Sequence, residues 1–320
     1  MTNIFIAEPL FADYASDAAA VAPGAEIVSF DGNQNAIPGI ETADAVAWNW
    51  YPRNRLETVV PAATNLKWLH VASAGVDWIL KSSIRSKQGL TLTDSGPAYD
   101  IAIPEYVIAW MFAIAKRIPQ FLAHQRNHEW VREVQGDLHG ATVGIVGLGP
   151  IGRGVALRAK ALGLRTLGYR RQNLPVEHVD EVLTGPEGLK RLVAESDYIV
   201  FAAALTDGTR QILSKSLIDS IKPTAWVLNI ARGALIDQAA LTIALQEGRI
   251  GGACLDVFDP EPLPKDSPLW DLPNVLITPH NSHGGGRALA LRRKEVYLDN
   301  LRRFIHDEPL QNIVSFEHGY

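Results

Sequence analysis

The segment 142–152 constrains this chain more than any other. Its sequence, TVGIVGLGPIG, is a short apolar run followed by three glycines spaced as G-x-G-x-x-G. The first, Gly147, permits a tight turn, the second, Gly149, lets an anion approach the backbone, and the third, Gly152, lets a helix pack closely on the strand. A helix that begins near Pro150 would direct its first N–H groups at that anion. The sequence therefore predicts a strand, a phosphate-binding turn and a helix, although the same pattern can be a purely structural connection.

The residues after the next strand indicate which nucleotide the turn binds. A helical pattern from Arg153 to Ala161 is followed by the strand candidate Leu164–Tyr169 and then by Arg170 and Arg171. A fold that prefers NAD places an acidic residue at this strand end to bind the ribose 2′-hydroxyl. Guanidinium groups bind a phosphate there by charge-assisted hydrogen bonds. We therefore expect NADP(H) to be preferred over NAD(H); the alternative is two solvated arginines in a loop.

Length and composition agree with two domains in a reducing compartment. A chain of 320 residues exceeds what one hydrophobic core usually supports. An apolar content of 47% is sufficient for buried sheets, and a net charge of −5 argues against a nucleic-acid partner. The single cysteine, Cys254, excludes an intramolecular disulfide. The N-terminus lacks the pattern of a signal peptide, and the most apolar run, Val107–Ala115, is too short to span a membrane. We expect a cytoplasmic protein.

Short apolar runs alternate with helical patterns along the chain, which predicts βαβ units and parallel sheets. A helical pattern from Ile103 to Glu129, interrupted at Pro119, leads to the glycine turn, and the last one runs from Arg287 to Ile305. Besides Leu164–Tyr169, the strand candidates are Ile4–Ala7, Ile27–Phe30, Ala45–Trp48, Trp68–Val71, Leu90–Thr93, Tyr198–Ala203, Trp226–Ile230, Ala253–Val257 and Val275–Thr278. We therefore expect an α/β protein, with a complete domain before the glycine turn.

Residues suited to acid–base chemistry follow the later strand candidates. Arg232, Glu261 and His280 each come after a different one, and open α/β sheets bind ligands at the carboxyl ends of their strands. A guanidinium can bind a 2-oxo acid, an imidazole can transfer a proton to its carbonyl oxygen, and a carboxylate can keep the imidazole protonated. Each residue alone has a structural explanation, as a salt-bridge partner, a solvated loop acid or a turn cap. Together they predict a catalytic group.

The motifs resemble those of the D-isomer-specific 2-hydroxyacid dehydrogenase family over nearly the full chain. They are Ala74–Asp77, the helix with Glu105, Leu138–Gly152, Leu205-Thr206, Asn229–Gly233, Leu255–Pro262 and Thr278–His280. Three segments are most similar to the glyoxylate/hydroxypyruvate reductase branch: Ala45–Trp48, Arg170-Arg171 and Glu261–Trp270. The resemblance implies NADPH-dependent reduction of a small 2-oxo acid to the D-2-hydroxy acid.

The resemblance also implies how the chain is divided. A Rossmann cofactor domain, residues 98–286, would be inserted into a flavodoxin-like substrate domain formed by residues 1–97 and 287–320, with the catalytic cleft between the two doubly wound sheets. Family members commonly dimerise through the cofactor domain, so the expected partner is a second copy of the chain. Neither a nucleic acid nor a membrane is expected as a partner.

Residue roles follow from the resemblance as well. Arg232 would bind the substrate, and Glu261 would hydrogen-bond His280, which would supply the proton. The remaining substrate-binding residues would be Trp48 and, through their backbone N–H groups, Ala74, Gly75 and Val76. The cofactor-binding residues would be Gly147, Gly149, Pro150, Ile151, Gly152, Arg170, Arg171, Leu205, Thr206, Ile230, Asp256 and His280, with Asp256 at the nicotinamide carboxamide.

Two other functions stay open on the same motifs. Formate dehydrogenases resemble this scaffold but place Gln where Glu261 stands, and Glu favours a histidine that takes up a proton. Phosphite oxidation is not excluded by this argument. Nucleotide-sensing corepressors, which are not enzymes, retain the motifs and often carry extended tails that nothing here resembles.

Three histidines outside the expected catalytic group have open roles. The family usually has a small residue two positions after the catalytic histidine, and here the run His280–Gly286 contains an extra histidine, His283. His283 could touch the substrate or be an ordinary loop residue. His124 and His128 stand four apart on a helical pattern and could share a metal ion. We expect no metal, because no third ligand is apparent. The role of the loop Trp48–Arg55, with Trp50 and Tyr51, stays open too.

Overall fold

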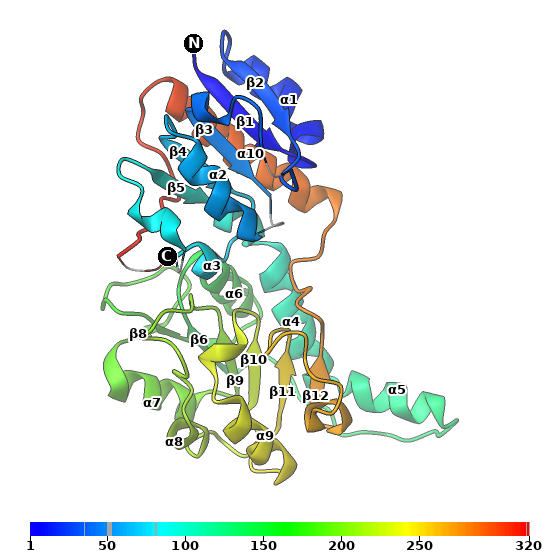
Figure 1. Cartoon of the computed structure of the whole chain (residues 1–320). Coiled ribbons are helices and arrows are strands. Elements are labelled where there is room, and N and C mark those ends of the chain that lie inside the picture. Colours follow the sequence, from blue (N-terminus) through cyan, green and yellow to red (C-terminus); the bar gives the residue numbers. More distant parts are fainter. Residues whose placement is uncertain (35, 50–52, 81, 318, 320) are drawn as a thin grey trace. The chain divides into compact units, whose positions relative to one another are not determined.

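The computed structural model describes residues 1–320 except 35, 50–52, 81, 318 and 320 (Figure 1). The chain forms two compact units. One consists of Met1–Tyr99 and Gly285–Tyr320, and the other of Asp100–Gly284. The second unit is therefore inserted into the sequence of the first, and each contains a parallel sheet of its own.

Within its described residues, the first unit has a five-stranded parallel sheet in the order β2-β1-β3-β4-β5. This is the strand order of flavodoxin-like folds. The strands are β1 (Asn3–Ala7), β2 (Glu26–Phe30), β3 (Ala45–Trp48), β4 (Trp68–Val71) and β5 (Thr91–Asp94). The helices are α1 (Leu10–Val21), α2 (Leu56–Ala62), α3 (Asp77–Leu80) and α10 (Arg287–Ile305), with short 3-10 turns η1 (Ile40–Thr42), η2 (Arg53–Arg55), η3 (Ser83–Ser86) and η4 (Gly96–Tyr99).

Both faces of this sheet are buried. Because side chains alternate along a strand, β1 directs Ile4 and Ile6 to one face and Phe5 to the other. The first face packs under α1 and α10, where Tyr14 stacks on Tyr297 with ring centroids 5.3 Å apart. The second packs under α2 and α3. Continuous burial on two faces explains why the strands are short apolar runs without polar alternation.

Within its described residues, the second unit has a seven-stranded parallel sheet in the order β12-β11-β10-β9-β6-β7-β8. Counted from β6, this is the doubly wound order of dinucleotide-binding folds. The strands are β6 (Thr142–Val146), β7 (Arg165–Tyr169), β8 (Glu181–Leu183), β9 (Tyr198–Phe201), β10 (Trp226–Asn229), β11 (Gly252–Leu255) and β12 (Val275–Ile277). The helices are α4 (Ala102–Ala115), α5 (Ile118–Arg126), α6 (Pro150–Ala161), α7 (Gly185–Glu195), α8 (Lys215–Ile218) and α9 (Gln238–Gln246), with η5 (Gly233–Leu235) and η6 (Pro268–Asp271).

The expected α/β fold with two doubly wound parallel sheets is confirmed, and each expected strand is present with bounds that differ by one or two residues at some ends. Strand β8 was not expected, because an edge strand of three residues is too short to show a period. The expected break at Pro119 comes earlier, at Lys116 and Arg117, where Arg117 has φ 57. Pro119 instead lies in the first turn of α5, a position that needs no proline N–H.

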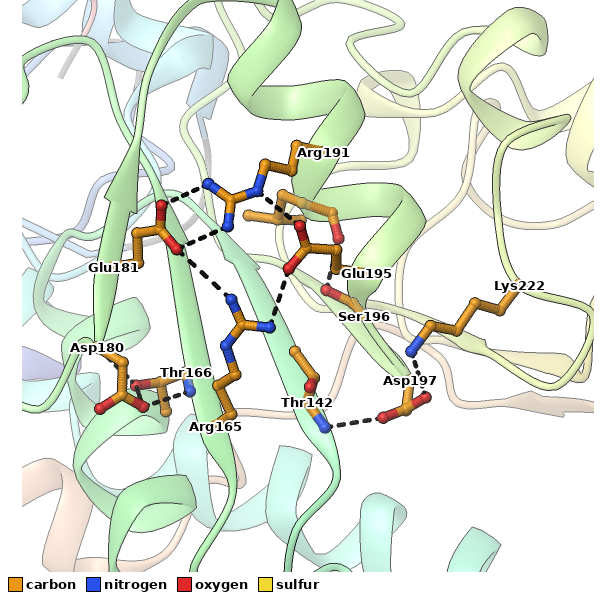
Figure 2. A network of polar contacts seen from close by, with 11 residues as sticks. Thr142, Arg165, Thr166, Asp180, Glu181, Arg191, Glu195, Ser196, Asp197 and Lys222 are labelled. Atoms are coloured by element: carbon orange, nitrogen blue, oxygen red, sulfur yellow. Dashed lines mark hydrogen bonds and ion pairs between the residues drawn. The ribbon is translucent and has the colours of Figure 1, made fainter.

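Ion pairs and carboxylate hydrogen bonds join the amino ends of the strands in the second unit (Figure 2). Asp197, which precedes β9, accepts a hydrogen bond from the Thr142 N–H at 2.8 Å and pairs with Lys222. A surface network joins Arg165 and Arg191 to two glutamates, Glu181 and Glu195. Exposed pairs of this kind stabilise a fold by only about 0–1 kcal/mol each. This edge of the sheet is structural, and the residues with chemical potential lie at the opposite edge.

One helical stretch in the described part of the chain, Gly96–Ala115, is long and apolar enough to cross a membrane by length and composition. It comprises η4 and α4 and buries Val107 and Met111 completely. Core helices that never meet a membrane satisfy the same two criteria.

Candidate functional site

The glycine turn lies between β6 and α6 and has the backbone that the sequence predicts. Gly147 has φ 100, a left-handed conformation in which glycine avoids the strain of a side chain. Its N–H donates to the Tyr169 carbonyl of β7 at 3.0 Å, which ties the turn to the neighbouring strand. A Cβ on Gly152 would lie 1.9 Å from the Gly147 carbonyl oxygen, so only glycine allows the first turn of α6 to approach the strand this closely.

Gly149 differs from the other two glycines, because the protein itself does not require it. It is the N-cap of α6 with φ −72, and an added Cβ would meet no protein atom within 4 Å. Glycine here leaves open space directly in front of the N-terminus of α6. The first backbone N–H groups of this helix, beginning with that of Ile151, have no partner within the helix. This open space in front of a helix N-terminus fits the pyrophosphate of a dinucleotide.

The other expected cofactor residues lie at the same carboxyl edge of this sheet. Arg170 directly follows β7 and is half-buried, with its N–H bonded to the Leu183 carbonyl of β8, and Arg171 is more exposed. Leu205 and Thr206 follow β9, and the Thr206 N–H bonds Thr209 Oγ1 at 2.7 Å. Ile230 follows β10 and is buried. The structure therefore brings residues that follow three strands, β7, β9 and β10, to the edge that holds the glycine turn.

Arg232, Glu261 and His280 also meet at this edge, and the contact between the last two is direct. Nδ1 of His280 lies 2.9 Å from Oε2 of Glu261, and Oε1 of Glu261 accepts the Phe258 N–H at 2.9 Å. The His280 and Glu261 side chains are 25% and 36% exposed, so both are accessible without being fully solvated. Arg232 follows β10, and its Nη1 donates to the Ala231 carbonyl at 2.7 Å.

Electrostatics link the three side chains. Burial raises the pKa of Glu261, but the hydrogen bonds from His280 and Phe258 and the charges of His280 and Arg232 outweigh burial and hold that pKa below its usual range. A carboxylate that stays ionised beside an imidazole favours the protonated imidazole. The arrangement can therefore bind an anion at Arg232 and supply a proton from His280.

Gly233 explains how Arg232 comes close to the Glu261 loop, and sequence reasoning gave it no role of its own. A Cβ at Gly233 would lie 2.0 Å from the Phe258 carbonyl carbon and 2.5 Å from the Asp259 backbone nitrogen. Two loops that follow different strands thus touch backbone to backbone at this glycine. The only signal in the sequence was that a glycine directly follows Arg232.

Asp256 lies at the end of β11 and is fully buried. Its carboxylate accepts hydrogen bonds from the Thr278 hydroxyl and from the N–H groups of Asn281 and Ser282. The resemblance placed Asp256 at the nicotinamide carboxamide, but no part of its side chain is exposed to a ligand here. Its contacts are to the segment that carries His280. Within that segment, His283 is half-buried.

In the first unit, Ala74, Gly75 and Val76 form the loop between β4 and α3. The Gly75 carbonyl accepts hydrogen bonds from Ser73 Oγ at 3.0 Å and from Trp78 Nε1 at 3.1 Å, which fixes the loop. Among the described residues, the N–H groups of Ala74, Gly75 and Val76 donate to no protein acceptor. The loop therefore presents backbone donors suited to an anion such as a carboxylate.

Trp48, expected near the substrate, is a core residue of the first unit. It is 0% exposed and packs on Phe30 with ring centroids 5.6 Å apart. Its side chain has no exposed surface that could line a pocket. Trp50 and Tyr51 of the following loop lie outside the described residues.

The two histidines considered for a metal do not come together as ligands. His124 uses both ring nitrogens for carboxylates, with Nδ1 2.9 Å from Glu129 and Nε2 3.0 Å from Glu133. These hydrogen bonds raise the pKa of His124. In the described part of the chain, no group of three or more His, Cys, Asp or Glu residues could hold a metal ion.

Comparisons with known proteins agree with this geometry. A family model for the NAD binding domain of D-isomer specific 2-hydroxyacid dehydrogenases matches residues 108–282. The chain is 35% identical over 266 residues to D-3-phosphoglycerate dehydrogenase of Methanocaldococcus jannaschii, over 80% of this chain and 49% of that protein. It is 33% identical over 269 residues to glyoxylate reductase of Korarchaeum cryptofilum, over 81% of this chain and 79% of that protein. The chain therefore spans about half the length of the first relative and most of the second.

A solved structure is similar over the whole chain. It is the D-isomer specific 2-hydroxyacid dehydrogenase from Xanthobacter autotrophicus in complex with NADPH and MES, with a TM-score of 0.87 and 29% identity over 100% of this chain and 99% of that one. The family model covers the unit that holds the glycine turn and the Arg232, Glu261 and His280 side chains. From its motifs, its two parallel sheets and these relatives, the chain belongs to the D-isomer specific 2-hydroxyacid dehydrogenase family.

Proposed function

We propose that this protein is an NADPH-dependent reductase that converts a small 2-oxo acid of the glyoxylate/hydroxypyruvate type to the D-2-hydroxy acid. The observation that carries the proposal is the contact between His280 Nδ1 and Glu261 Oε2 at 2.9 Å, in reach of the charge of Arg232. An ion-paired imidazole beside a guanidinium is what the reduction of a carbonyl next to a carboxylate requires.

Each of the three side chains has one task in the proposed reaction. Arg232 binds and orients the 2-oxo acid through its planar fork of N–H donors. Glu261 accepts a hydrogen bond from the Nδ1–H group of His280 and stabilises the imidazolium. The other ring nitrogen, Nε2, is therefore the one that gives its proton to the carbonyl oxygen. In the other unit, the N–H groups of Ala74, Gly75 and Val76 are our candidates for binding a carboxylate.

NADPH, when bound, supplies the hydride that reduces the substrate carbon. We propose that Gly147, Gly149 and Gly152, with the first turn of α6 at Pro150 and Ile151, hold its pyrophosphate. Arg170 and Arg171 would bind the 2′-phosphate at the end of β7. Leu205, Thr206 and Ile230, with His280, complete the cofactor-binding edge.

The relatives support this class of reaction. The glyoxylate reductase relative matches most of its own length, and the similar solved structure contains NADPH. The phosphoglycerate dehydrogenase relative is matched over 49% of its length, which makes its whole-protein activity a weaker guide. We further propose a cytoplasmic homodimer with no nucleic-acid, membrane or metal partner.

The experiment that tests the proposal is NADPH oxidation with glyoxylate, hydroxypyruvate and a panel of bulkier 2-oxo acids. Turnover of the small acids with formation of the D-isomer is expected. Formate should not reduce NADP, because Glu261 favours a protonated His280, which the oxidation of formate does not use. Phosphite is assayed in parallel, and reduction of NADP by phosphite would favour the alternative dehydrogenase function instead. Binding of NADPH without turnover of any 2-oxo acid would identify the protein as a nucleotide-sensing binding protein instead.

Cofactor preference is expected to depend on Arg170 and Arg171. If each guanidinium makes a charge-assisted contact of about 1.5–3 kcal/mol with the 2′-phosphate, replacing both with alanine should weaken NADPH binding about a hundredfold or more. NADH binding should change little. Both affinities are measured by nucleotide fluorescence. Arg165→Ala is the matched control, because Arg165 begins the same strand at its opposite end. Equal losses for NADPH and NADH would contradict the assignment.

Gly149→Ala separates cofactor binding from folding. Since its Cβ would meet no protein atom within 4 Å and φ is −72, the midpoint of thermal unfolding should stay within a degree or two of the unchanged protein. The methyl group would occupy the space left for the pyrophosphate, so the affinities for NADPH and NADH should both fall, by about tenfold or more. Unchanged affinity for both nucleotides would mean that the pyrophosphate lies elsewhere.

A further inference from the structure

The backbone at His280 has a conformation that residues other than glycine do not favour. His280 has φ 53, in the left-handed region that residues other than glycine rarely adopt. Its N–H donates to the Asp256 carbonyl at 2.7 Å. Surrounding structure has to enforce this conformation, and the contacts that do so converge on Asp256.

The Asp256 carboxylate holds the segment on both sides of His280. Oδ1 accepts the Thr278 hydroxyl at 2.5 Å and the Asn281 N–H at 2.8 Å, and Oδ2 accepts the Ser282 N–H at 2.9 Å. Successive N–H groups that follow a left-handed residue form a concave nest for an anion. Here the anion is a side chain of the protein itself, from the neighbouring strand β11.

The Asp256 carboxylate is buried from solvent. Asp256 is 0% exposed, and Ser282 is 4% exposed. The hydroxyl of Tyr106 from α4 bonds Thr278; burial raises the pKa of that hydroxyl, and the Thr278 contact opposes the rise. The Asp256 oxygens therefore accept hydrogen bonds from three protein donors and have no exposed surface.

We propose that Asp256 is a positioning residue, whose carboxylate holds the left-handed turn at His280 and thereby keeps the imidazole on Glu261. This inference rests on the proposed function, since it concerns the same proton donor. It replaces the carboxamide contact that the resemblance implied for Asp256. Glu261, by contrast, contacts the His280 ring, and the charge of Arg232 acts on Glu261.

Asp256→Asn tests the proposal, because it keeps the shape and removes one acceptor. In either orientation of the asparagine amide, its NH₂ group lies opposite the N–H of Asn281 or that of Ser282. Both groups are donors, so one of the two hydrogen bonds is lost. If His280 moves by about 1 Å, kcat for the 2-oxo acid should fall roughly a hundredfold. The affinity for NADPH should stay within about twofold, because the Asp256 carboxylate is buried and bonded to protein donors. With Glu261 no longer in contact, the high-pH decline of kcat/KM should begin at lower pH.

A readout without turnover keeps the two proposals separable. In protein labelled with ¹⁵N-histidine, the Nδ1–H signal of His280 bonded to Glu261 should be present in the unchanged protein and absent in Asp256→Asn. Failure of the unchanged protein to reduce any 2-oxo acid would count against the proposed function and leave this signal intact. An unaltered signal in Asp256→Asn would overturn the positioning role. So would a large loss of NADPH affinity with an unmoved pH profile, which would restore the carboxamide contact.

Two substitutions at Thr278 give the same test with less risk to folding. Thr278→Val keeps the shape of the side chain and removes the hydroxyl that donates to Asp256 Oδ1. It should therefore lower kcat, weaken the Nδ1–H signal and shift the pH profile in the same direction as Asp256→Asn, but by less. Thr278→Ser retains the hydroxyl and should restore the Nδ1–H signal and the pH profile. Identical behaviour of the valine and serine variants would contradict the proposal even if Asp256→Asn fails to fold.

Discussion

Replacing His280 with alanine is expected to remove nearly all 2-oxo acid reduction at every pH. A positioned general acid contributes roughly 10²–10⁴-fold to rate, and His280, bonded to Glu261 Oε2, is the proposed proton donor. NADPH affinity should change far less than kcat. Robust turnover by His280→Ala would remove this histidine from the mechanism.

Glu261→Gln is expected to move the pH dependence instead of abolishing activity. In the proposed reaction a proton is given to the carbonyl oxygen, so kcat/KM of the unchanged protein should be highest at low pH and fall as pH rises. The pKa of Glu261 is held below its usual range, so its carboxylate stays ionised to lower pH than an ordinary glutamate. A neutral glutamine no longer favours the imidazolium, and the decline should begin at lower pH.

A pH–rate profile of these proteins with saturating NADPH checks both expectations. Asp259→Asn is the matched control, because Asp259 belongs to the same loop but lies 3.8 Å from Arg210. Its decline should coincide with that of the unchanged protein. Coincidence of the Glu261→Gln decline with the unchanged one would show that the two side chains are not coupled.

Gly233→Ala is expected to have the largest effect on stability. A Cβ at this position would lie 2.0 Å from the Phe258 carbonyl carbon and 2.2 Å from its oxygen, and both are backbone atoms that cannot rotate away. Forcing extra volume into a packed site costs typically about 1–3 kcal/mol, and a backbone collision belongs at the upper end. The displaced loop carries Glu261, so kcat should fall together with the midpoint of urea unfolding.

Gly149→Ala is the control for this substitution, because it adds the same methyl group where no protein atom lies within 4 Å. It should change nucleotide affinity while leaving the unfolding midpoint in place. A Gly233→Ala variant as stable as Gly149→Ala would mean that the two loops separate at little cost.

Much of the fold could be predicted from local sequence. Parallel strands buried on both faces are short apolar runs, and these identified nearly all strands. The bounds were least certain at the carboxyl ends. Residues such as Ala202-Ala203 after β9 are apolar but turn out of the sheet at its carboxyl edge, where Gly147 packs against them. Strand β8 was missed because three residues give no period.

The sequence by itself determined the glycine turn, the arginine pair at the end of β7 and the order of the chemistry-bearing residues along the strands. These are local properties, since a G-x-G-x-x-G turn and a strand end are each set by neighbouring residues. It could also place Arg232, Glu261 and His280 at one edge, because parallel strands end on the same side of a sheet.

Only the tertiary structure decided how those residues are held. Three contacts join residues that follow different strands. They are the 2.9 Å contact of His280 with Glu261, the backbone contact at Gly233, and the hydrogen bonds of Asp256 to the His280 segment. Burial decided the rest: Trp48 and Asp256 are typical binding residues by type, yet both are fully buried. Exposure depends on the packing of the complete unit, and the order of residues in one strand does not contain it.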